Sequence, residues 1–63
     1  MKNFIELTEK DNGKILVNVY HILDISIDRG ETIIWTSVVY GTSAKVFHVT
    51  ESYEEVKKLI DKL

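Results

Sequence analysis

Few residues of this 63-residue chain could do chemistry, and two histidines are the first candidates. His21 is followed three positions later by Asp24, and His48 is followed three positions later by Glu51. Side chains three positions apart on a strand point to opposite faces. A zinc site needs three or four converging ligands, often including thiolates, and the chain contains no cysteine. We therefore expect no metal site, and we interpret both histidines as partly exposed residues with hydrogen bonds.

Nucleophilic catalysis would have to combine Ser37 or Ser43 with a histidine and an aspartate. Neither serine lies in a nucleophile elbow, and the sequence has no glycine-rich phosphate loop or Walker sequence. A chain of this length also has little volume for a closed, preorganised pocket. We expect that the protein is not an enzyme and that it uses no cofactor.

Aromatic residues indicate a different kind of site. Trp35 and Tyr40 could come from two subunits and stack a planar ligand such as a nucleobase, although core and interface packing would explain the same residues. Arg29 could neutralise a phosphate of that ligand, or it could be a solvated turn residue. The residues that we predict to contact a ligand are Arg29, Trp35, Tyr40, Thr42, Ser43, His48 and Tyr20.

Strands must position these residues. Leu23, Ile25 and Ile27 alternate with polar residues, which is typical of a half-buried strand. Asn12-Gly13 predicts a type I′ hairpin turn, in which both central residues need positive φ. The predicted strands cover residues 4–8, 14–18, 22–28, 31–40 and 44–49, with a break at 18–21 and a turn at 29–30.

The pattern then changes to helical spacing. Ser52 and Glu55 have the spacing of a capping box, so we predict a helix over residues 53–63. Its apolar stripe consists of Tyr53, Val56, Leu59, Ile60 and Leu63. So short a helix is not stable alone in water, and its stripe must pack on the sheet. The expected fold class is α+β, with one domain over residues 1–63: an antiparallel meander of about five strands and one C-terminal helix.

The strand over residues 31–40 is mostly apolar on both faces. One short helix covers only part of one face of such a sheet, so the remaining surface must meet a second subunit, curl into a barrel or bind something. A chain this small also has a thin core and no disulfide to reinforce it. We expect a homodimer or a higher oligomer. The predicted interface residues are Ile34, Val38, Val39 and Tyr40.

Charge and hydropathy disfavour two classes of partner. The net charge is −2 and Arg29 is the sole arginine, so the concentrated basic face that nucleic acid requires is missing. No apolar run approaches the roughly 20 residues that cross a bilayer, and no basic segment leads into an apolar one at the N-terminus. We expect a cytoplasmic protein without a membrane or nucleic-acid partner.

Several stretches resemble the small FlbD-like flagellar and swarming-motility proteins: FIEL, the Asn-Gly hairpin, VNVYHILDISID and FHVTESYEEVKKLI. The resemblance spans nearly the whole chain and implies a strand meander that ends in one helix. The segment over residues 32–45 is several residues longer than the tight hairpin expected there, and it is apolar. A weaker likeness to the strand-rich half of LytTR-type domains lacks their basic recognition residues.

Two functions therefore compete. The first is a non-enzymatic homo-oligomeric module that captures or sequesters a small, nucleotide-like ligand in inter-subunit pockets. The alternative is a regulatory accessory protein, of a motility type or encoded by a phage, that docks another protein through a sheet edge or the apolar arm. A DNA-binding regulator ranks below both.

Overall fold

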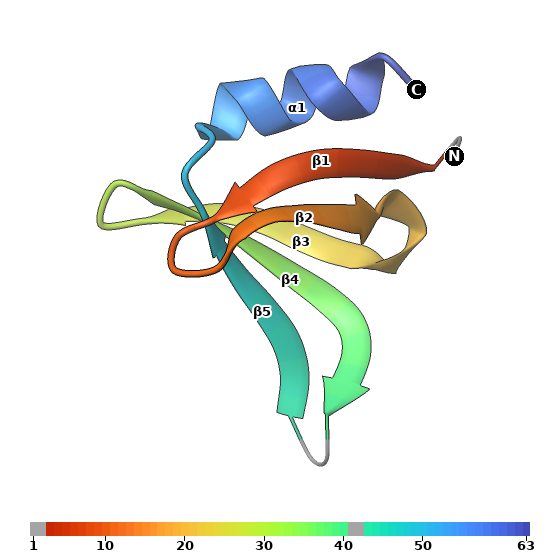
Figure 1. Ribbon diagram of the computed structural model, residues 1–63, viewed down its shortest axis with the longest axis vertical. Coiled ribbons are helices and arrows are strands. Elements are labelled where there is room, and N and C mark those ends of the chain that lie inside the picture. Colours follow the sequence, from red (N-terminus) through yellow and green to blue (C-terminus); the bar gives the residue numbers. More distant parts are fainter. Residues whose placement is uncertain (1–2, 41–42) are drawn as a thin grey trace.

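The computed structural model describes residues 3–40 and 43–63, except for the side chains of Val39, Tyr40 and Ser43. In this part of the chain, five antiparallel strands form one sheet, and one α-helix follows the last strand (Figure 1). The elements are β1 (Phe4–Glu9), β2 (Gly13–Asn18), the 3₁₀ helix η1 (Val19–His21), β3 (Ile22–Asp28), β4 (Glu31–Tyr40), β5 (Ser43–Val49) and α1 (Tyr53–Asp61). The predicted α+β fold is confirmed.

The strands lie in the order β2-β1-β5-β4-β3. β3, β4 and β5 follow one another as in a simple meander, whereas β1 joins the sheet between β2 and β5. The edges of a flat five-stranded sheet would be about 19 Å apart. Only the three residues of η1 separate edge strands β2 and β3, so the Cα atoms of Asn18 and Ile22 are four chain steps and at most about 14 Å apart. The sheet must therefore curl, which turns one face into an interior.

That interior holds the core. Its buried members are Ile5, Leu7, Val17, Ile34, Val49 and Val56, which come from β1, β2, β4, β5 and α1. The predicted capping box is present: Glu55 N–H donates to Ser52 Oγ (3.1 Å), and Ser52 N–H donates to Glu55 Oε1 (2.9 Å). α1 buries Val56 completely, as the predicted stripe requires. The helix ends at Asp61, so Leu63 lies beyond it and is exposed.

One of the two predicted hairpin turns differs from expectation, and the other is present at residues 29–30. In the β1–β2 turn only Gly13 has positive φ (83°), so the prediction of a type I′ turn at Asn12-Gly13 is wrong. Asn12 N–H donates to Glu9 O (3.3 Å) instead, which makes a longer loop that closes at the pair of Glu9 and Gly13. Both central residues of the β3–β4 turn have positive φ, Arg29 at 53° and Gly30 at 82°. That turn has the type I′ pattern.

Ile34 is not an interface residue. Its side chain is 0% exposed in the protein's own core, so it has no surface to offer a second subunit. The prediction failed because the curled sheet turns this face of β4 inward. Val38 is on the surface, whereas the side chains of Val39 and Tyr40 lie outside the described residues.

In the described residues, α1 is too short and too polar to cross a membrane.

Candidate functional site

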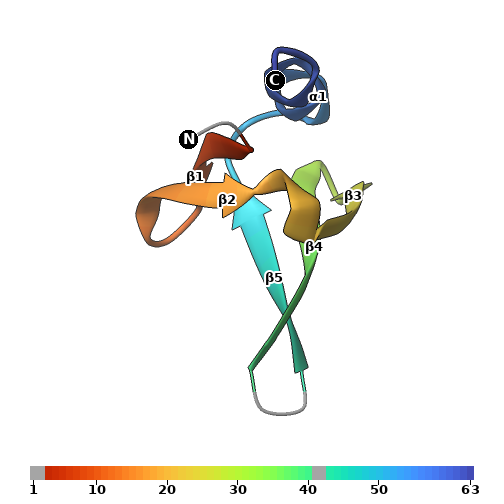
Figure 2. The ribbon, with the colours of Figure 1, turned by 90° about the vertical axis from the view of Figure 1, so that its right-hand side faces the viewer.

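The sheet splits between β1 and β5. These strands pair at one position only, Glu9 with Val49, next to a backbone hydrogen bond from Lys10 N–H to His48 O (2.8 Å). β1 and β2, by contrast, pair along their whole length. The β1–β2 ribbon and the β4–β5 ribbon therefore diverge from this point, and Figures 1 and 2 show the β4–β5 ribbon extending away from α1.

A glutamate marks where the split begins. Thr8 N–H donates to Glu51 Oε1 (2.8 Å), and Thr8 Oγ1 donates to Glu51 Oε2 (2.9 Å). Thr8 O accepts from Thr50 N–H (2.9 Å) on the same side of β1. The Glu51 carboxylate thus takes the place of a strand carbonyl, because the N–H and C=O of one strand residue point the same way. The ladder between β1 and β5 ends at this carboxylate.

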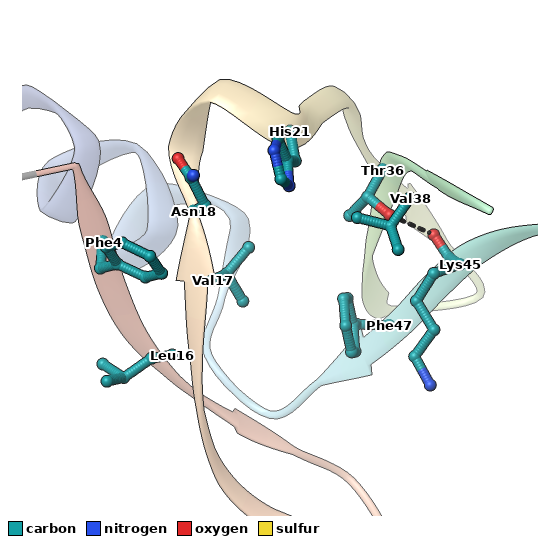
Figure 3. Close-up of a pocket in the computed structure, with 9 residues that line it drawn as sticks. All are labelled: Phe4, Leu16, Val17, Asn18, His21, Thr36, Val38, Lys45 and Phe47. Atoms are coloured by element: carbon teal, nitrogen blue, oxygen red, sulfur yellow. Dashed lines mark hydrogen bonds between the residues drawn. The ribbon is translucent and has the colours of Figure 1, made fainter. Parts of the chain in front are cut away.

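A cleft of about 300 Å³ lies between the two ribbons (Figure 3). Phe4 and Leu16 stand on the β1–β2 side, Phe47 stands on the β5 side, and η1 passes over the gap. The lining is mainly apolar, and none of its residues is acidic. The residues that line the cleft are Phe4, Leu16, Val17, Asn18, His21, Thr36, Val38, Lys45 and Phe47.

An irregular stretch of β4 shapes the far wall of the cleft. The register between β4 and β5 shifts between Trp35 and Val39, so that the intervening β4 residues oppose Lys45 alone. Thr36 is buried there, and its Oγ1 donates to Lys45 O (2.8 Å). This bond links β4 to β5 where the register shift interrupts their backbone pairing. The extra length directs Val38 into the cleft.

The roof of the cleft is η1, and Asn18 fixes its start. Asn18 Oδ1 accepts from Tyr20 N–H (3.0 Å), the N-cap interaction that the sequence break requires. Val19 N–H also donates to Asn3 O (2.7 Å), which ties η1 to the start of β1. The His21 ring extends from η1 toward the gap (Figure 3). The cleft therefore has one imidazole among its apolar walls.

One cation lies at the cleft. Lys45 Nζ is 5.1 Å from the centre of the Phe47 ring, within the range of a cation–π contact. Lys45 and His21 are the residues of the lining that can carry positive charge. The whole chain has a net charge of −2, but the lining of the cleft holds Lys45 and no carboxylate, which favours an anion locally.

The structure does not bring the predicted ligand residues together. Arg29 and Tyr40 flank opposite ends of β4, a strand of ten residues and a chain path of about 30 Å. His48 lies near the Arg29 end, where its side chain contacts Glu31. Within one chain, these residues cannot surround a single small ligand.

The other predicted residues are also dispersed. Trp35 is 45% exposed and lies on the opposite face of β4 from buried Ile34, so neither core burial nor the cleft explains it. Tyr20 is 75% exposed on η1 and does not line the cleft. The predictions for Tyr40 and Ser43 concern side chains outside the described residues, and Thr42 lies outside them altogether.

A polar cluster occupies the other end of the sheet. Glu31 contacts Lys10 of the β1–β2 loop and His48 Nδ1 (3.1 Å) of β5. The hydrogen bond from Lys10, followed by that from His48, lowers the pKa of Glu31 below its ordinary value of 4.5. The same contact raises the pKa of Lys10. This cluster joins the loop to the sheet.

Glu31→Gln is expected to make the stability of the fold less dependent on pH below about 4.5. Because the folded pKa of Glu31 is lowered, its contribution is fully present above pH 4.5 and is lost as the pH falls through the lower folded value. Melting temperatures of wild type and Glu31→Gln between pH 7 and pH 3 should therefore converge toward acid. Lys10→Met should reproduce part of the effect, because Lys10 is the main cause. Parallel curves would contradict the assignment.

Sequence reasoning missed most of the cleft. Phe4 and Leu16 could have been recognised from the sequence. Each is apolar although it lies on the strand face opposite to the buried Ile5 and Val17, where a half-buried strand normally carries a polar residue. Thr36 and Lys45 meet only because of the register shift in β4. No local pattern in the sequence reveals that shift.

Within residues 3–40 and 43–63, no group of three or more histidines, aspartates or glutamates could hold a metal ion. No family model, no curated protein and no solved structure matches the chain.

Proposed function

We propose that this protein is a non-enzymatic binding module that captures a small ligand with a flat apolar body and an anionic group. The observation that carries this proposal is the cleft between the β1–β2 and β4–β5 ribbons. Its volume of about 300 Å³ is at the lower end of the range for ligand pockets. A ligand the size of one or two fused rings fills such a space.

The side chains of the cleft support a flat ligand. Phe47 offers a ring surface on one side of the gap, Val17 offers an apolar surface across from it, and Phe4 adds a second ring beyond β2 (Figure 3). Aromatic side chains stack planar ligands with little sequence or substituent selectivity. Asn18 and His21 supply polar atoms at the roof, which is the sparse set of oriented groups that gives a small-molecule site its specificity.

The charge of the cleft supports an anionic group. Lys45 and His21 lie in a lining without carboxylates. A nucleotide is one ligand of this kind, with its base between the ribbons and its phosphate at Lys45. An aromatic carboxylate is a second, and the test separates the two.

The proposed module is a homo-oligomer. Phe4, Leu16 and Val38 form an exposed apolar rim along the open side of the cleft. A second copy that covers this rim would enclose the ligand, which places the pocket between subunits.

Titration calorimetry with AMP and with naphthalene carboxylate tests the proposal. We expect saturable binding of at least one of them, and a loss of about tenfold or more in Val38→Glu, which adds negative charge at the cleft. Leu63→Glu is the matched control, because Leu63 is an equally apolar exposed residue far along the chain from the cleft. The absence of binding by either ligand, or equal losses in both variants, would refute the proposal. Native mass spectrometry of the same samples gives the subunit number.

A further inference from the structure

Exposed apolar side chains gather on η1 and β3. The three most exposed large apolar residues in the described part of the chain are Tyr20 at 75%, Leu23 at 70% and Ile27 at 60%. They lie within eight consecutive residues. Single exposed apolar residues are ordinary, whereas a group of them marks an interaction surface. None of the three lines the cleft.

β3 is also an edge strand. It pairs with β4 on one side only, and it stands at the end of the sheet order. Apart from the ladder to β4 and the bond from Ile22 N–H to Val19 O that caps η1, no hydrogen bond among the described residues involves residues 22–28. Every second residue of an edge strand presents its N–H and C=O outward. The backbone of β3 can therefore accept a further strand.

The charge of this edge is acidic. Asp24 and Asp28 are exposed on one face of β3, and the sequence has no lysine or arginine between Lys14 and Arg29. Two copies that paired through β3 in an antiparallel register centred on Ser26 would place Asp24 opposite Asp28. Like charges directly opposite each other destabilise a strand pair. The edge is thus suited to a basic partner and poorly suited to a second copy of itself.

We propose that the β3 edge docks an extended segment of another protein in which basic and apolar residues alternate. The segment adds a strand to the sheet, with its basic side chains beside Asp24 and Asp28. Its apolar side chains lie on the other face, which carries Ile27. Acidic residues on an edge strand also protect proteins from aggregation, but protection alone would not leave Leu23 and Ile27 exposed.

The probe is a fluorescent seven-residue peptide in which lysine and valine alternate, matching the seven residues of β3. Binding is measured by fluorescence anisotropy at low salt, and the site is mapped by backbone amide shifts. We expect shift changes along β3, and binding at least about tenfold tighter than that of the glutamate–valine peptide. A lysine–valine peptide with alternate amides methylated should also lose about tenfold, because its backbone cannot complete the new ladder.

Protein variants test whether the charges of Asp24 and Asp28 contribute to peptide binding. The double variant Asp24→Asn, Asp28→Asn should weaken binding by about threefold to tenfold at low salt and by less at high salt. Asp61→Asn, on an exposed helix position, should leave binding unchanged. Equal binding of the methylated peptide, equal binding of the glutamate–valine peptide, or shift changes confined to β2 would each overturn the proposal. Self-association through β3 without any peptide would do the same.

Discussion

Ile34→Ala is expected to lower the free energy of unfolding by about 2–5 kcal/mol, the usual cost of truncating a fully buried isoleucine. Ile34 is 0% exposed and packs among core residues from four other elements. A domain of 63 residues has a free energy of unfolding of only about 3–9 kcal/mol. Chemical denaturation followed by Trp35 fluorescence should therefore show a variant that is largely unfolded or close to it.

The matched control is Ile27→Ala, the same substitution on a side chain that is mostly exposed. We expect a change of no more than about 0.5 kcal/mol there. Protein concentration distinguishes the core role of Ile34 from the interface role that its sequence pattern predicted. A core residue lowers stability equally at all concentrations, whereas an effect that vanished at high concentration would restore the interface interpretation.

The elements of the fold were predictable because each depends on local sequence. Alternation in β3 and the spacing of Ser52 and Glu55 place their elements without reference to the rest of the chain. The pairing of β1 with β5 was not predictable, because it is a short long-range contact around the pair of Glu9 and Val49 that no local pattern marks. Without that pairing, the curl of the sheet and the burial of Ile34 could not be inferred.

The cleft was not predictable for a related reason. It is formed where the sheet separates, so its walls mix residues from both strand faces, such as Leu16 and Val17. Periodicity assigns residues to faces and cannot identify a gap between ribbons. The ligand residues predicted from their types, such as Arg29 and His48, instead lie at the end of β4 remote from the cleft.

The η1 segment connects the two proposed sites. His21 lies over the cleft, while Tyr20 is exposed next to the β3 edge. The same three-residue turn positions His21 and Tyr20. It is held by the Asn18 cap and by the hydrogen bond from Val19 to Asn3. Docking at β3 and ligand capture in the cleft therefore depend on one local structure, although different side chains serve each.

Glu51→Ala is expected to cost about 2–3 kcal/mol of unfolding free energy. An ordinary hydrogen bond contributes up to about 1.5 kcal/mol, and Glu51 accepts two part-buried ones from Thr8, in which solvent screens the carboxylate charge. Removing the carboxylate also leaves Thr8 N–H without its acceptor. Because β1 and β5 share only one other paired position, the variant should also loosen the cleft and weaken ligand binding beyond the loss of stability. Urea denaturation and calorimetry measure the two effects.

Thr8→Val and the double variant complete a cycle that isolates the side-chain hydrogen bond. Thr8→Val removes only the Oγ1 contact with Glu51, so we expect a coupling of about 1 kcal/mol, with the remainder belonging to the backbone amide. Glu6→Ala is the control, because it removes an exposed carboxylate from the same strand and should cost less than about 0.5 kcal/mol. If Glu51→Ala behaved like Glu6→Ala, the carboxylate would not hold the two ribbons together, and the β1–β5 pairing would have to be sufficient to define the cleft.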